Sequence, residues 1–197
     1  MSKRTKILVW LVIGVTLLYF LYHSGKYTVE RMKSPFKYFT WSEFDSGAMP
    51  SDVADPEILT HKNTKGKNLL TGSGEANMDK NFIFALDTIR EKVGFPIVIV
   101  AGNGYRSDAY NAHVGGVPRS SHRRIGEPKV KAADLYLPTY EMKQAVAEAA
   151  IELGITRFGW GTGTLLHIDN DLSKSQDVVW GYGGAHPSFS DLTSNLA

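Results

Sequence analysis

The chain carries GYRSDAYNAHVGGVPRSSHRRIGEPKVKAADL at Gly104–Leu135 and LLHIDND at Leu165–Asp171. Among the histidines and carboxylates of these stretches, His122, Asp134 and His167 lie in surroundings that offer few other reasons for them. Zinc at a catalytic centre takes three protein ligands of nitrogen and oxygen type and leaves a fourth position open. These three residues are therefore chemically sufficient for such a zinc site.

These residues lie within short motifs that follow one another along the chain. The motifs are GYRS (Gly104–Ser107), YNAHVGGVPRSSH (Tyr110–His122), AADL (Ala132–Leu135), HID (His167–Asp169) and VVWGY (Val178–Tyr182). In this order they resemble the zinc D-Ala-D-Ala carboxypeptidases of peptidase family M15, in particular the murein peptidases of bacteria and phages. The resemblance covers about Phe39–Tyr182, including FTWSEF at Phe39–Phe44 and the segment Met78–Ile99.

The resemblance implies a function and a set of site residues. It matches His122, Asp134 and His167 to the zinc ligands of a peptidase that hydrolyses stem peptides or crossbridges of peptidoglycan. It matches Arg106 to an arginine that serves the substrate, and a guanidinium suits a carboxylate or the oxyanion of a scissile carbonyl. Ser120 is expected to bind substrate as well. A surface ion pair is the alternative role for Arg106.

The chain departs from the family pattern in two places. Eleven residues, RRIGEPKVKAA, separate His122 from Asp134, whereas the resembling enzymes usually have a shorter spacer. Those enzymes also place an acidic residue three positions before the last histidine, or a histidine two positions before it, as the general base. Thr164 and Leu165 occupy these positions here, and neither accepts a proton at neutral pH. We therefore expect Asp169 to be the base, with Glu127 as the second candidate.

Each candidate ligand also has an ordinary structural explanation. A histidine such as His122, taken alone, is more often a solvated loop residue, and an isolated HID triplet is more often an exposed strand. Asp134 lies in the apolar context AADL, where it would otherwise be a cap. Burying an unpaired carboxylate there would cost several kcal/mol, so a metal, an arginine or a histidine must compensate it.

Two functions other than peptidase activity stay open. The missing acid at Thr164 motivates a catalytically inactive module that holds peptidoglycan peptides in the same groove. The other alternative is a structural membrane-anchored protein, for example of a phage virion, in which the fold organises contacts only.

Composition agrees with a peptidase without requiring one. With 197 residues, of which 43% are hydrophobic, the chain can bury one substantial core. Its net charge of +2 gives no reason to expect a nucleic acid as partner. The sequence has no cysteine, which excludes disulfides, lipid-modified cysteines and thiolate ligands.

The N-terminal segment predicts attachment to a membrane. Ile7–Tyr22 is a run of sixteen residues without a charge, preceded by three basic residues. A helix needs about 17 to 25 apolar residues to span a bilayer, so His23–Gly25 would have to join the run. A cleaved signal peptide is the alternative, but bulky residues precede Ser24 and Gly25, which favours an uncleaved single-pass anchor. The substrate implied by the resemblance puts the domain in the periplasm or outside the cell, or on a virion membrane.

Periodicity and capping residues predict an α+β domain with a small, mainly antiparallel sheet packed with helices, as in the Hedgehog and DD-peptidase folds that the resemblance implies. The predicted helices are Met78–Val93, Ser107–Val114 and Tyr140–Leu153, and the predicted strands are Pro96–Ala101, Val130–Leu137, Arg157–Trp160 and Leu165–Asp169. Asp45–Glu75 is expected to be a loop. The predicted organisation is an anchor at 1–25, a tether at 26–38, a peptidase domain at 39–182 and a loosely ordered tail at 183–197.

Strand geometry makes a specific prediction for the last strand. Alternate side chains of a strand lie on opposite faces of the sheet. Leu166 and Ile168 are therefore expected to enter the core, whereas His167 and Asp169 share the other face and can meet His122 there.

Overall fold

The computed structural model describes residues 34–125, 128–194 and 196. These residues belong to two units, a short one that ends at Thr40 and a larger one, Trp41–Ala197. In the short unit, the Ser34 hydroxyl donates a hydrogen bond to the Phe39 carbonyl over 2.8 Å. The predicted anchor, Ile7–Tyr22, lies outside the described residues. Among the residues that the structure describes, no helix is long and apolar enough to cross a membrane.

The larger unit is built on a five-stranded sheet with the strand order β3-β4-β6-β5-β7. Its strands are β3 (Val98–Ile99), β4 (Ala132–Tyr136), β5 (Arg157–Trp160), β6 (Leu165–Asp169) and β7 (Val178–Gly181). Every neighbouring pair is antiparallel except β5 and β7, which run parallel. The predicted α+β class with a small, mainly antiparallel sheet is confirmed.

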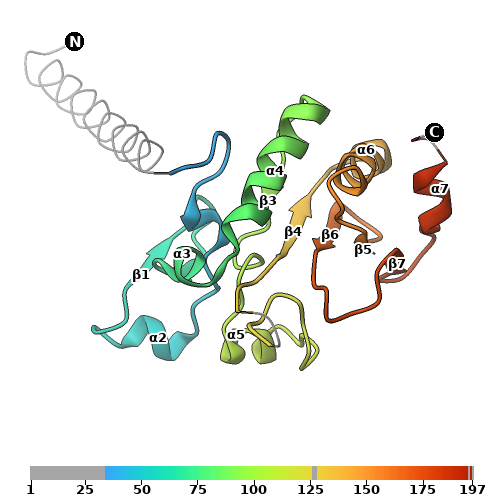
Figure 1. Ribbon diagram of the computed structural model, residues 1–197. Coiled ribbons are helices and arrows are strands. Elements are labelled where there is room, and N and C mark those ends of the chain that lie inside the picture. Colours follow the sequence, from blue (N-terminus) through green and yellow to red (C-terminus); the bar gives the residue numbers. More distant parts are fainter. Residues whose placement is uncertain (1–33, 126–127, 195, 197) are drawn as a thin grey trace, which may run out of the picture. The chain divides into compact units, whose positions relative to one another are not determined.

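Two helices begin after predicted capping residues, and the first also ends as predicted, whereas the second ends at Ile151, before the predicted end at Leu153. Helix α4 (Lys80–Val93) begins after Asp79, whose carboxylate accepts hydrogen bonds from two backbone N–H groups of the first turn, and ends at Gly94 with φ 74°. Helix α6 (Tyr140–Ile151) begins after Thr139, whose hydroxyl accepts from the N–H of Met142. The two helices pack on each other, and Figure 1 shows them beside the sheet.

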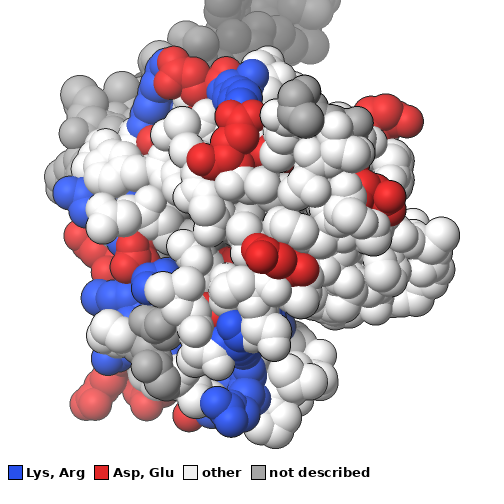
Figure 2. Space-filling model, turned by 45° about the vertical axis from the view of Figure 1, so that its right-hand side comes forward, with Lys and Arg blue, Asp and Glu red and all other residues white. Residues whose placement is uncertain are grey.

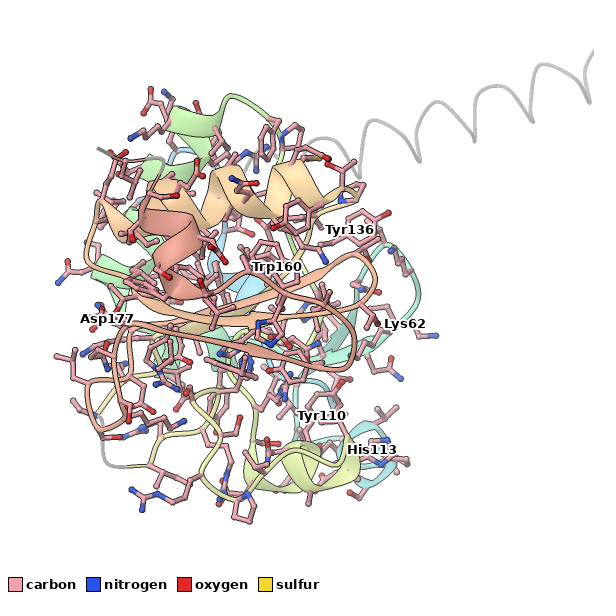
Figure 3. The ribbon with its side chains drawn as sticks, turned by 90° about the vertical axis from the view of Figure 1, so that its right-hand side faces the viewer. Lys62, Tyr110, His113, Tyr136, Trp160 and Asp177 are labelled. Carbon is pink, nitrogen blue, oxygen red and sulfur yellow. The ribbon has the colours of Figure 1, made fainter. Side chains whose placement is uncertain are left out.

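Helix α6 covers one face of the sheet, and side chains that alternate along the strands build the core beneath it. Trp160 of β5 lies on this side, where its ring is 5.3 Å from that of Tyr140 in α6 (Figure 3). The fully buried members of this layer are Ala133, Leu135, Phe158, Leu166 and Ile168. The prediction that Leu166 and Ile168 enter the core is therefore confirmed.

The opposite face of the sheet carries polar side chains. Asp134 of β4 pairs in register with His167 of β6, and Arg157 of β5 pairs with Asp169 of β6. Helix α5 (Asp108–His113), which Ser107 caps, lies on this side of the sheet in Figure 3. The loop that follows α5 brings His122 to the same face.

The prediction of a loop at Asp45–Glu75 is wrong. The segment contains helices α2 (Pro50–Ala54) and α3 (Ser73–Asn77) and the antiparallel hairpin of β1 (Thr60–Lys62) and β2 (Asn68–Leu70), after the 3-10 helix η1 (Trp41–Phe44). The buried Asp45 carboxylate holds this segment, because it accepts hydrogen bonds from the backbone N–H groups of Gly74 and Gly72 over 2.6 and 3.3 Å.

Two smaller expectations also differ from the structure. The predicted buried strand Pro96–Ala101 is reduced to β3 at the sheet edge, where Ile97 and Ile99 are buried but Val98 is half exposed. The tail, expected to be loosely ordered, contains helix α7 (Phe189–Thr193), which packs on α6 and buries Leu192. A capping box at Ser188 starts this helix.

Candidate metal centre

Three side chains from distant parts of the chain meet on the polar face of the sheet. Asp134 and His167 face each other across β4 and β6, and His122 approaches from the loop after α5. Asp134 Oδ1 lies 2.8 Å from His167 Nδ1 and 3.2 Å from His122 Nε2, and the two ring nitrogens are 3.0 Å apart. All three residues are at least 96% buried. The three predicted ligands therefore form one buried cluster, suited to holding a metal ion.

The main chain holds the ring of His122 through the nitrogen that faces away from Asp134. Its Nδ1 lies 2.7 Å from the carbonyl oxygen of Gly104, and its own carbonyl accepts a hydrogen bond from the N–H of Arg106 over 2.8 Å. A side chain at Gly104 would collide with the backbone of Phe44, since an added Cβ would lie 2.7 Å from its Cα. Glycine is therefore needed for the carbonyl of residue 104 to reach the ring.

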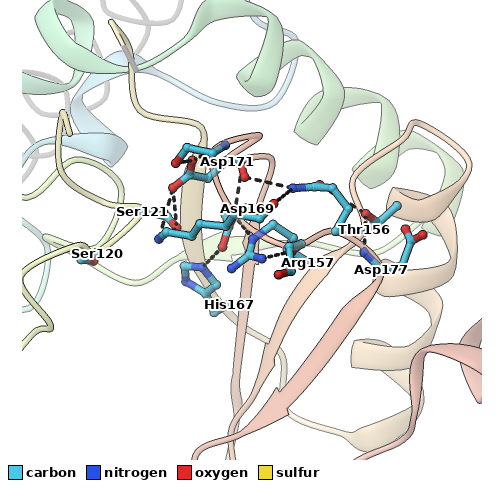
Figure 4. Close-up of polar contacts among 12 residues, drawn as sticks. Ser120, Ser121, Thr156, Arg157, His167, Asp169, Asp171 and Asp177 are labelled. Atoms are coloured by element: carbon cyan, nitrogen blue, oxygen red, sulfur yellow. Dashed lines mark hydrogen bonds and ion pairs between the residues drawn. The ribbon is translucent and has the colours of Figure 1, made fainter. Parts of the chain in front are cut away.

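A carboxylate holds the ring of His167 through the nitrogen that faces away from Asp134. Its Nε2 lies 2.8 Å from Asp169 Oδ2, while Asp169 Oδ1 accepts a hydrogen bond from Arg157 Nε over 2.7 Å and from the N–H of Asp171 over 3.1 Å (Figure 4). Arg157 also donates to the carbonyl of Ser175. Asp169 has no exposed surface.

These backing contacts determine which atoms face the cluster. When His122 Nδ1 donates to Gly104 and His167 Nε2 donates to Asp169, each ring turns an unprotonated nitrogen toward Asp134. Two lone pairs and a carboxylate oxygen then converge, and such a group requires a cation between its members. Two imidazoles and one carboxylate, each supported by an outer hydrogen bond, are a donor set that fits zinc.

The charges in the cluster shift the pKa values of its members. Burial lowers the pKa of His122, and the charge of Asp134 opposes this only in part, so His122 is neutral at neutral pH. Burial also disfavours the charged form of His167, but hydrogen bonds to Asp134 and Asp169 outweigh it and raise the pKa to about 9. Burial raises the pKa of Asp134, but the charges and hydrogen bonds of the two histidines dominate and hold it well below the usual value. In the metal-free protein, a proton on His167 therefore supplies the compensating charge.

Arg106 lies next to the ligands. One terminal nitrogen of its guanidinium, Nη2, donates to Asp134 Oδ2 over 2.6 Å, and its Nε donates to Asn103 Oδ1 over 3.1 Å. The carboxylate of Asp134 therefore presents one oxygen to the histidines and the other to an arginine. The predicted compensation of this buried carboxylate is confirmed, with both an arginine and histidines as its partners.

The remaining predicted residues lie around this cluster. The hydroxyl of Ser120 accepts a hydrogen bond from the N–H of His122 over 3.3 Å, so Ser120 shapes the loop that presents this ligand. Its expected contact with substrate stays a prediction. Glu127 lies outside the described residues. The long spacer that contains it returns to β4 through Val130, whose backbone pairs with that of Met78.

The prediction that Asp169 acts as the general base stays a prediction, and the contacts of Asp169 favour another role. Its carboxylate lies on the Nε2 side of His167, whereas the other two ligands lie on the Nδ1 side. Burial disfavours the charged form of Asp169, but the hydrogen bond and charge of His167, followed by the charge of Arg157, outweigh it and lower the pKa of Asp169 to about 2. Such a buried, paired carboxylate is suited to orienting His167.

Several residues of the site were not identified from the sequence. Arg157 supports Asp169, and the ring of Trp180 in β7 lies 5.5 Å from the ring of His167 and 5.3 Å from the guanidinium of Arg157. The motif VVWGY marked this part of the chain but assigned it no role. The signal that was available is the alternation of β7, which, continued by one residue past the end of the strand, places Trp180 and Tyr182 on one face.

One face of the molecule carries charges of both signs. In Figure 2, basic and acidic side chains are interspersed on the face shown, without an extended area of one sign. A broad electrostatic field of one sign is therefore not a feature of this face.

Comparison with known proteins gives one match. A family model described as Peptidase M15 matches residues 56–169, more than half of the chain. The matched range contains His122, Asp134 and His167, together with Arg106 and Asp169. No curated protein and no solved structure matches the chain.

Proposed function

The chain belongs to the peptidase M15 family, and we propose that it is a zinc-dependent peptidase that hydrolyses peptide bonds in the stem peptides or crossbridges of peptidoglycan. The observation that carries this proposal is the convergence of His122 Nε2, Asp134 Oδ1 and His167 Nδ1 within 3.2 Å of one another. Both histidines are backed by outer hydrogen bonds, as ligands of catalytic zinc usually are.

In the proposed reaction, this chain provides the scaffold for the metal and part of the substrate site. A bound zinc ion would polarise the scissile carbonyl and lower the pKa of a coordinated water. His122, Asp134 and His167 would hold the ion, and Asp169 would keep the ring of His167 in the required orientation. Arg106 would fix the outer oxygen of Asp134 and also contact the oxyanion or a carboxylate of the peptide.

A second candidate function is binding of peptidoglycan peptides without hydrolysis. The residues before the last ligand support it, because Thr164 and Leu165 stand where the resembling enzymes carry a base. The metal would then be structural or would orient the bound peptide only. This candidate requires the same ligand set and differs from the first only in turnover.

Digestion of purified murein separates the two candidates. The full chain should release peptides from murein that mass analysis can identify, a chelator should stop the release, and added zinc should restore it. His167→Ala serves as the inactive control, since it removes a ligand. If murein binds but no peptide appears with zinc present, the binding function replaces the peptidase. The masses of the products identify the scissile bond.

We also propose that Ile7–Tyr22 anchors the protein in a membrane with the peptidase domain on the outer side. The apolar run and the basic residues before it support the anchor. The proposed substrate supports the orientation, because peptidoglycan lies outside the cytoplasmic membrane.

A further inference from the structure

Strand β7 extends the polar face of the sheet beyond the metal ligands. It lies next to β5, and Trp180 pairs in register with Gly159, which in turn pairs with His167. The ring of Trp180 lies against that of His167, and the ring of Tyr182 meets Trp180 edge to face at 6.3 Å. Tyr182 is therefore the next side chain along this face after Trp180, which packs against His167.

Gly159 leaves the space that the phenol of Tyr182 occupies. A Cβ added to Gly159 would lie 2.8 Å from Tyr182 Oη and 3.0 Å from the Cβ of His167. The phenolic oxygen and the ligand side chain thus lie on either side of one backbone position. Any larger residue at 159 would displace one of them.

The position of Tyr182 suits a residue that contacts a bound substrate. Its backbone N–H donates to the carbonyl of Trp160 over 3.0 Å, which fixes the residue after the strand, while 52% of the residue is exposed. Burial of the phenol raises its pKa and outweighs the hydrogen bond with Trp180, which lowers it, so the phenol is a neutral hydrogen-bond donor at neutral pH. The charges of Asp134 and Arg106 both act on it, which agrees with its place beside the cluster.

We propose that Tyr182 is a catalytic residue whose phenol donates a hydrogen bond to the oxyanion that forms on the scissile carbonyl. This inference rests on the proposed peptidase function. In the reaction, the oxygen of water bonds to the carbonyl carbon, the C–N bond breaks, and the products are a carboxylate and an ammonium group. Tyr182 neither gains nor loses a proton overall, because it acts only through its hydrogen bond.

Tyr182→Phe tests the proposal, because it removes only the hydroxyl and keeps the ring over Gly159. Loss of one oxyanion donor typically lowers kcat about 10²-fold to 10³-fold. We expect a decrease of this size with KM changed less than about threefold and zinc content unchanged. Tyr140→Phe is the matched control, since Tyr140 is also half exposed but packs on Trp160 across the sheet. It should keep the parent kcat.

A phosphinate analogue of the scissile peptide provides a second measurement, because its P–O⁻ occupies the place of the oxyanion. Tyr182→Phe should weaken its binding by about the same factor as kcat/KM, and the affinity for the product peptide should stay constant. An active parent with an equally active Tyr182→Phe variant overturns the role of Tyr182 and leaves the peptidase function intact. A parent that shows no zinc-dependent hydrolysis overturns both.

Discussion

Asp169 holds the imidazole of His167 from the side opposite the other ligands, with 2.8 Å between Oδ2 and Nε2. The same carboxylate is bound by Arg157, so the orientation of His167 depends on an ion pair within the sheet. Both Asp169 and Arg157 come from strand positions that pair in register. The outer support of this ligand is therefore built into the pairing of β5 and β6.

The first prediction concerns the metal. The full chain should bind about one zinc ion per molecule, because three protein ligands form one open site. His167→Ala should lower the zinc content measured by elemental analysis to near zero after dialysis. His113→Ala is the control, as His113 is exposed on α5 and belongs to the same sequence motif. Full zinc content in the His122, Asp134 and His167 triple alanine variant would rule out this site.

The second prediction distinguishes the two roles of Asp169. If it orients His167, Asp169→Asn should weaken zinc binding about 10-fold to 100-fold, the usual effect of losing an outer partner of a ligand. If it is the general base, the variant should keep zinc affinity and lose turnover by about 10²-fold or more. Competition with a chromogenic chelator measures the affinity. Asp177→Asn, at an exposed carboxylate, should leave both quantities unchanged.

The third prediction concerns Arg106. Its removal leaves Asp134 Oδ2 without its arginine partner, and breaking a buried ion pair costs about 3–5 kcal/mol. Arg106→Ala should therefore lower the free energy of unfolding of the metal-free protein by an amount of this order. With zinc bound, the loss should be smaller, since the ion also neutralises Asp134. Urea denaturation with chelator and with zinc measures both values, and equal losses in the two states would contradict the pairing.

The fourth prediction concerns pH. The pKa of His167 is raised from 6.5 to about 9 in the metal-free fold. Its proton therefore stabilises that fold fully below about pH 6.5, and the stabilisation is lost as the pH rises through about 9. Because zinc must displace this proton, its affinity should rise with pH by up to about tenfold per unit between these values. Calorimetric titration should show release of about one proton at pH 7. An affinity that is constant over this range would contradict the assignment.

The fifth prediction concerns location. The full chain should remain in the membrane fraction after alkaline washing, with an uncleaved N-terminus. Protease added to spheroplasts should digest the domain if it faces outward. A mature N-terminus at Gly25 or Lys26 would show cleavage instead, and complete protection from protease would reverse the orientation.

The resemblance pointed to His122, Asp134 and His167, which the structure brings into one cluster, and a local pattern predicted the strand that carries His167. Period-two alternation alone separates His167 and Asp169 from Leu166 and Ile168, and the structure confirms this division, since the side chains of His167 and Asp169 contact each other. The side chain of His167 has two nitrogens, however, and alternation does not say which of them faces Asp169. That choice depends on a side-chain rotation and on the neighbouring strands.

Features that depend on strand pairing or on distant contacts were missed. Arg157 reads as an ordinary strand residue until β5 is placed in register with β6. The short elements of Asp45–Glu75 have weak periodicity, and they are held by hydrogen bonds between Asp45 and backbone groups 27 and 29 residues away. Neither relationship leaves a local pattern in the sequence.

The two histidine ligands differ in how they would tolerate mutation over evolutionary time. The acceptor behind His122 is the main-chain carbonyl of Gly104, which every amino acid possesses, so it can be displaced but never deleted by a substitution. The acceptor behind His167 is a side chain, and a single base change in its codon can remove it. The support of His167 can therefore be lost outright by one substitution, whereas the support of His122 can be lost only by a shift of the backbone.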